Sequence, residues 1–301
     1  MLWIVVALFA YFLFAAVFFV DKYLLTGPIA SPKLYTFYTG VLRVAVVLLI
    51  PFIDFSFPGF SQLILSFLAG GFFVWGLFWF FKGLQLFEPS RVVPAVGGTL
   101  PVFTFLIVFV VSSGEALPKL LHIFALAAMI LGSVLISYER AKKVSLESLK
   151  PSLLAAFLFA VSFVCVKYVY LAQSFLQGFI WITLGGFFAV LFLLLSKEVR
   201  DNLFQGKEKL PKKTMAIFIS NQAAGAGANI LQNWAVALAP LAYVALVNAL
   251  QGAQYVFLLV LAVLLSAKFP QILKEEVSRG VIYQKIVAVL LIGGGLVLLT
   301  L

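Results

Sequence analysis

Amide side chains are concentrated in one strongly apolar stretch of the sequence, residues 214–236. The amides are Asn221, Gln222, Asn229, Gln232 and Asn233. Spacings of 7 and 4 place 222, 229 and 233 on one face of a helix. Such a face could hydrogen-bond a polar solute in a cavity, or it could join helices at about 1 kcal/mol per amide. We expect Gln222, Asn229 and Asn233 to line a cavity.

Two further stripes of side chains have helical spacing. Asn248, Gln251 and Tyr255 are separated by 3 and 4 residues, and Trp75, Trp79 and Lys82 by 4 and 3. Amides would hydrogen-bond a polar group, whereas indole rings would stack on a flat or apolar one. We include all six residues among the candidate cavity-lining residues, although tryptophans also gather at lipid interfaces.

Charged side chains inside apolar runs are rare here. Arg43 is the only basic residue deep in such a run, and a charge there needs a partner or a functional cavity. Lys22 and Lys167 lie near the ends of their runs, where long side chains can reach lipid headgroups. Asp21, beside Lys22, is interpreted as a solvated helix end.

The sequence lacks the residue sets that catalysis and metal binding need. A single cysteine, Cys165, and a single histidine, His122, cannot supply a disulfide or a zinc site. Neither a phosphate-binding G-x-x-x-x-G-K-[ST] string nor an H-E-x-x-H motif occurs. We therefore expect neither an enzyme nor a protein with a cofactor or metal.

The composition indicates where these residues are placed. The 301-residue chain is 64% hydrophobic and only 11% charged, against about 25% charged residues in soluble domains. This excludes a soluble enzyme, a nucleic-acid-binding domain and a disordered protein. An integral membrane protein remains, with the lipid bilayer as its surroundings.

Ten apolar runs are long enough to cross a bilayer as helices, which takes about 20 residues. The runs are apolar on all sides, unlike the alternating strands of a β-barrel. The sequence therefore predicts an all-α membrane protein of ten transmembrane helices. The runs cover residues 2–21, 33–53, 62–82, 91–112, 118–138, 151–170, 175–196, 214–236, 240–266 and 281–301.

Basic residues follow the alternation of these runs. Of 21 lysines and arginines, 18 lie in the loops after the odd-numbered runs, including loops 139–150 and 197–213. By the positive-inside rule these loops are cytoplasmic and both termini face outside. We expect a multi-pass protein of a bacterial or archaeal cytoplasmic membrane.

The chain also contains an internal repeat. Residues 13–25 resemble 158–170, residues 82–93 resemble 233–244, and residues 122–136 resemble 285–299, in the same order. The matches divide the chain into two five-helix units, 1–145 and 146–301. Because five is odd, the second unit enters the membrane inverted, an arrangement typical of alternating-access transporters.

These features resemble the drug/metabolite transporter superfamily, in its ten-helix branch of EamA-domain proteins. The resemblance covers the whole chain and implies two inverted five-helix repeats and solute transport. The basic loops here argue for termini outside, whereas better-known relatives keep theirs in the cytoplasm. The matching positions are Lys22 and Lys167, Arg43 (with Phe188 at its counterpart), Pro101, Glu115 with Gly132, and Glu275 or Glu276 with Gly295.

The sequence thus predicts a transporter of a small metabolite, amino acid or drug-like solute, by export or exchange, acting as a monomer or homodimer. A nucleotide-sugar or phosphate-ester carrier is an alternative that would need several cations in the cavity. A lipid-handling or structural membrane protein is another.

No carboxylate lies in the middle of a run, so we expect facilitated diffusion or exchange. We expect helices 5 and 10 to join the halves through small residues.

Overall fold

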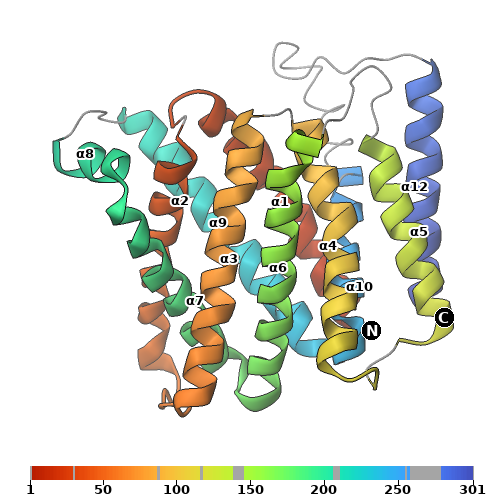
Figure 1. Ribbon diagram of the computed structural model, residues 1–301, viewed down its shortest axis with the longest axis horizontal. Helices are drawn as coiled ribbons and strands as arrows, with labels where there is room; N and C mark the ends of the chain where they lie inside the picture. The colour runs from red at the N-terminus through yellow and green to blue at the C-terminus, as the bar shows by residue number, and fades with distance from the viewer. Residues whose placement is uncertain are drawn as a thin grey trace.

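A computed structural model describes residues 2–29, 31–86, 89–115, 118–137, 146–205, 211–254, 256–257 and 279–300. In this part of the chain the regular structure is helical, with no strand (Figure 1). The prediction of an all-α protein is therefore confirmed for the described residues.

The first five predicted runs contain helices that alternate in direction through the bundle. Ser31 caps the second helix by accepting a hydrogen bond from the Leu34 backbone N–H, and Pro32 begins it. Ser113 and Gly114, both with positive φ, form the turn after α4. The elements are α1 (Leu2–Thr26), α2 (Pro32–Val41), its 3-10 continuation η1 (Leu42–Phe52), α3 (Phe60–Leu86), α4 (Pro89–Val111) and α5 (Leu120–Ser137).

The second half has a similar order of elements, with α8 and the short 3-10 helix η3 in addition. Its second helix, like that of the first half, ends in 3-10 geometry. The elements are α6 (Leu146–Ala172), α7 (Phe175–Leu191), η2 (Phe192–Leu195), α8 (Lys197–Gln205), α9 (Lys212–Leu238), η3 (Leu241–Tyr243), α10 (Val244–Ala249) and α12 (Arg279–Thr300).

Five helices of the described chain are long and apolar enough to cross a membrane: Leu2–Leu25, Pro32–Phe52, Phe60–Leu86, Lys150–Ala172 and Phe175–Leu195. Three shorter helices are also apolar: Ala95–Val111, Leu120–Leu135 and Ile286–Gly295. The five are consistent with a membrane protein. The count of ten crossings stays a prediction.

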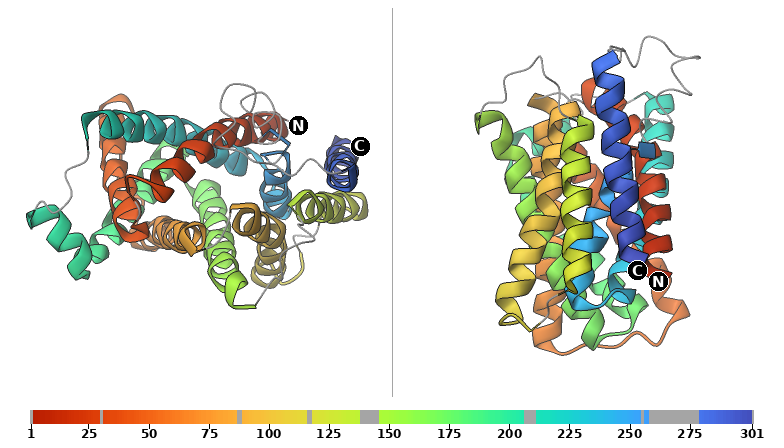
Figure 2. Two further views of the ribbon diagram at one scale, coloured as in Figure 1. Left: turned by 90° about the horizontal axis from the view of Figure 1, so that it is seen from above. Right: turned by 90° about the vertical axis from the view of Figure 1, so that its right-hand side faces the viewer.

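Helices from the two halves pack against each other throughout the bundle (Figures 1 and 2). α1 packs along α9, α3 lies between α6 and α7, and α5 pairs with α12. Glycines bring two of these pairs close together. A Cβ on Gly70 would lie 1.9 Å from the Ile182 carbonyl oxygen, and one on Gly132 would lie 2.9 Å from that of Ala288.

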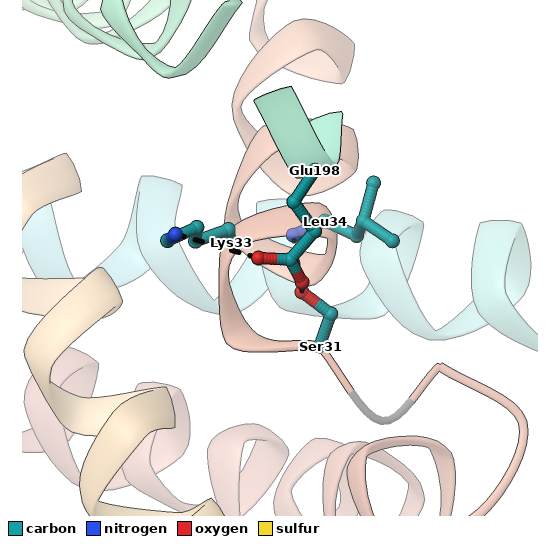
Figure 3. A network of polar contacts seen from close by, with 4 residues as sticks. All are labelled: Ser31, Lys33, Leu34 and Glu198. Atoms are coloured by element: carbon teal, nitrogen blue, oxygen red, sulfur yellow. Dashed lines mark hydrogen bonds and ion pairs between the residues drawn. The ribbon is translucent and has the colours of Figure 1, made fainter. Parts of the chain in front are cut away.

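The predicted charged loop 197–213 contains a helix, α8, which the hydropathy pattern does not reveal because the helix is short and polar. α8 lies at one end of the bundle and extends away from it (Figures 1 and 2). Glu198 accepts a hydrogen bond from the Ser31 hydroxyl and pairs with Lys33 at 3.4 Å between Nζ and Oε2 (Figure 3). These contacts attach α8 to the start of α2.

Candidate functional site

A cavity of about 420 Å³ lies in the middle of the bundle. Side chains from both halves of the chain line it, from α1, α2, η1, α3, α4, α6, α7, α9 and residues 251–254. None of the lining residues belongs to α5 or α12. Its wall is mainly apolar and rich in phenylalanine, with a small number of polar side chains, as in typical sites for small molecules.

Asp21 of α1 lines this cavity, so its interpretation as a solvated helix end is wrong. The Tyr35 hydroxyl and the Asn221 amide, which donates at 2.7 Å, both hydrogen-bond its Oδ1. Gln222 in turn donates to the Tyr35 hydroxyl at 3.4 Å. Three helices, α1, α2 and α9, therefore meet at one carboxylate. Asp21 lies in the last turns of α1, and its position toward the cavity depends on how α9 packs there.

Arg43 also lines the cavity, from the start of η1. Its guanidinium carbon lies 4.7 Å from the centre of the Phe73 ring, a cation–π contact with α3. Among the described residues no carboxylate lies within ion-pair distance of Arg43. Of the two interpretations left open by the sequence, a structural pair and a cavity residue, the described residues favour the cavity.

The predicted amides are divided between the cavity and the helix interfaces. Gln222, Asn229 and Gln251 line the cavity. Asn233 accepts a hydrogen bond from Tyr170 at 3.0 Å and donates to the Asn229 carbonyl, outside the cavity wall. The fully buried Asn248 donates to Thr104 at 2.9 Å and links α10 to α4. Tyr255 lies outside the described residues.

The aromatic stripe of α3 has a different position. Trp75 and Trp79 are partly buried against the apolar core and do not line the cavity. Lys82 lies over the Trp79 ring, with Nζ 4.7 Å from its centre, and does not line the cavity either. Helical spacing correctly groups these three side chains, but it does not show which side of α3 faces the cavity.

Several polar residues of the cavity wall are not among the predicted lining residues: Tyr11, Asp21, Thr39, Thr183, Gln232 and Gln254. The Gln232 amide donates to the Tyr11 hydroxyl at 3.2 Å, and Tyr11 donates to the Val247 carbonyl at 3.0 Å. Gln254 follows Gln251 by three residues, which is the spacing that could have indicated it. The hydroxyl residues lie singly in apolar runs and give no pattern.

Lys167 is buried, which corrects the expectation that it reaches the headgroups. Its side chain is 4% exposed, and Nζ donates to the Ala237 carbonyl at 2.9 Å. Lys167 thus connects α6 to the end of α9.

Comparisons with known proteins identify the fold and leave the family open. No protein-family model matches the chain, and no curated protein matches it. Among solved structures, one crystal structure aligns over 99% of this chain and 95% of its own, with a TM-score of 0.66 and 17% sequence identity. At that identity the likeness is one of fold alone.

Proposed function

We propose that this chain is a membrane transporter, similar to the EamA branch of the drug/metabolite transporter superfamily, that moves a small solute by alternating access. One observation carries the proposal. Both halves of the chain contribute to a single central cavity whose apolar wall carries a few polar side chains. Transporter sites are typically located where two repeats meet near the bilayer midplane.

The packing of the helices supports the inverted repeat. In the proposed repeat, α1 corresponds to α6, α9 to α3 and α5 to α12. When each helix is replaced by its counterpart, the α1–α9 pair becomes the α6–α3 pair, and the α5–α12 pair becomes itself. Gly132 of α5 closely approaches α12, and its repeat partner Gly295 approaches α5, where a Cβ would lie 2.9 Å from the Ala125 carbonyl oxygen. This reciprocity is the contact pattern that a two-fold relation between halves produces.

The distribution of charge supports one orientation. α8, with Lys197 and Arg200, lies at one end of the bundle, while both marked chain ends lie toward the other (Figure 1). Under the positive-inside rule the α8 end is cytoplasmic and the termini are outside. The membrane that fits this arrangement is a bacterial or archaeal cytoplasmic membrane.

A phosphate-ester or nucleotide-sugar carrier has less support. Such a carrier would need several cations around the solute. Of the two candidates, Arg43 lines the cavity, whereas Lys82 packs on Trp79 outside it. A lipid-handling or structural protein would not need the amides that face the cavity, so solute transport is the better interpretation of the same residues.

Solute counterflow in proteoliposomes tests the proposal. A thermal-shift screen of amino acids, nucleosides, sugars and cationic drugs first selects a ligand. We expect that ligand to exchange across the membrane, and Asn229→Ala to reduce both its binding and its exchange. Asn202→Ala, an amide substitution on α8 outside the cavity, is the matched control and should leave both unchanged. Folded protein that binds and exchanges none of these solutes overturns the proposal.

A further inference from the structure

The cavity contains two side chains of opposite charge that do not pair with each other. Asp21 and Arg43 both line it, and no ion pair joins them among the described residues. A charge without a partner in an apolar cavity is costly and becomes favourable when a ligand supplies the opposite charge. Each residue therefore indicates one end of a ligand.

Asp21 uses only half of its carboxylate within the protein. Tyr35 and Asn221 both donate to Oδ1. Oδ2 receives no hydrogen bond from the described residues, although a carboxylate oxygen can accept two. The two protein donors fix the orientation of the group and leave one oxygen for a cationic donor from the cavity.

Arg43 likewise has hydrogen-bonding groups that the protein itself does not use. Its guanidinium has five N–H donors, and among the described residues none of them makes an ion pair. The guanidinium lies over the Phe73 ring, with Nη1 so near Gly186 of α7 that an added Cβ there would be 3.2 Å away. Stacking on a ring leaves the N–H donors in the guanidinium plane free. An anionic group, a carboxylate above all, satisfies that geometry.

Two helices give similar axial separations between the residues that anchor these groups. Tyr35, which holds Asp21, and Arg43 are eight residues apart on α2 and the 3-10 helix η1, which is about 13 Å along the axis at about 1.5 Å per residue in α2 and about 2.0 Å in η1. Phe81, whose ring centre is 4.9 Å from that of Tyr35, and Phe73, beneath Arg43, are also eight residues apart on α3. The rise on α3 is about 12 Å, so subtracting a charge-assisted hydrogen bond of about 2.8 Å at each end leaves about 6–7 Å between the charged groups of the ligand.

We infer that the cavity takes an elongated zwitterion, with an ammonium group at Asp21 and a carboxylate at Arg43, on opposite ends of an apolar or aromatic body. Phe80, Phe159 and Phe163 line the same cavity and provide the apolar wall. An α-amino acid, whose two charged groups share one carbon, cannot reach both residues. The inference rests on the proposed function, because it names the class of solute that the transporter would carry.

Two isomeric amino acids distinguish a site for an elongated zwitterion from a site with general affinity for amino acids. In 6-aminohexanoate the charges are separated by five methylene groups, an extended chain of about the required length. Norleucine has the same molecular formula, but its ammonium and carboxylate groups are attached to one carbon. We expect 6-aminohexanoate to bind the purified full chain, measured by calorimetry, about ten-fold or more tightly than norleucine, hexanoate or hexylamine.

Substitutions of Asp21 and Arg43 test which charged group of 6-aminohexanoate each residue binds. Asp21→Asn, which keeps the side-chain shape, and Arg43→Gln should each weaken 6-aminohexanoate binding about ten-fold or more. Arg43→Lys keeps the cation and should weaken it less. The matched controls, Asp54→Asn and Lys119→Gln, change exposed charges outside the cavity and should have no effect.

Equal binding of the two isomers, or unchanged binding in both cavity variants, overturns the inference. Counterflow of a different solute without any binding of 6-aminohexanoate overturns the inference and leaves the proposed function standing. If no solute of the screen and neither isomer is exchanged, the proposed function fails, and the inference fails with it.

Discussion

At the scale of single residues, hydrogen bonds decide which polar groups of the bundle face the cavity. Asn248 is fully buried and uses its amide on Thr104, so it links two helices. Asp21 has a similar demand for donors but is satisfied on one oxygen alone. Residue type does not distinguish these two roles, since an asparagine or a carboxylate can serve either. The partners available on neighbouring helices make the difference.

Tyr35 is the residue on which the Asp21 arrangement depends. It is fully buried, lies edge-on to Phe81 and Phe218, and donates its hydroxyl proton to Asp21. Tyr35→Phe keeps the ring contacts and removes one hydrogen bond to a charged group. We expect the free energy of unfolding to fall by roughly 1–3 kcal/mol, measured as a lower melting temperature of the purified protein.

Tyr283→Phe is the control for this substitution, because Tyr283 is 71% exposed on α12. Its melting temperature should equal that of the unsubstituted chain. An equal melting temperature for Tyr35→Phe as well would contradict the role given to the Tyr35 hydroxyl.

At the scale of helices, small residues set how closely neighbours approach. α3 and α7 meet at glycines on both sides: a Cβ on Gly70 would lie 2.4 Å from the Gly186 nitrogen, and one on Gly185 would lie 2.5 Å from the Phe67 Cα. Contact between backbones maximises van der Waals packing where no hydrophobic effect drives association. Phe73 follows Gly70 by three residues on α3 and lines the cavity.

Gly70→Ala tests this packing. The added methyl group has no space, since the obstacle is backbone on α7, so α3 and α7 must move apart. We expect a marked loss of thermal stability, on the order of 1–3 kcal/mol as for overpacked cores, together with weaker ligand binding. Differential scanning fluorimetry and calorimetry measure the two effects.

Gly293→Ala on α12 is the matched control, because a Cβ there meets nothing within 4 Å. Alanine is the better helix former by roughly 0.5–1 kcal/mol, so the melting temperature should stay equal or rise. A similar loss of stability in both variants would count against close packing at Gly70 as its cause.

At the scale of the whole molecule, orientation decides which end of the cavity opens to the cytoplasm. The proposed orientation, which follows from the positive-inside rule, puts Lys197 and Lys150 in the cytoplasm and Ser56 outside. Cysteines introduced at these positions, in a Cys165→Ser background, would react with a membrane-impermeant maleimide from opposite sides. In intact cells we expect labelling at position 56 only, and in inverted vesicles at 150 and 197.

All three positions belong to the described chain, and residues 150 and 197 are exposed in the folded protein. Detergent-solubilised protein, in which every exposed cysteine is accessible, serves as the positive control. Labelling of positions 150 and 197 from outside intact cells would contradict the proposed orientation.

From the order of residues along the chain, the all-α class, most of the described helices and several residues of the cavity wall could be predicted. Helix positions follow from apolar runs and their breaks, because a backbone in lipid must satisfy its hydrogen bonds within the helix. Gln222, Asn229 and Arg43 could be selected because polar groups in apolar runs are costly. These properties are local along the chain, so they can be recognised without knowing which helices are neighbours.

How these helices face one another became visible only in three dimensions. Trp79 and Lys82 share a face of α3, but that face packs away from the cavity. Asp21 lies near a helix end in sequence and beside α9 and α2 in space. Helical rotation and long-range pairing depend on contacts between residues 200 positions apart, such as Asp21 with Asn221. No local pattern specifies such contacts, and the cavity exists only where they meet.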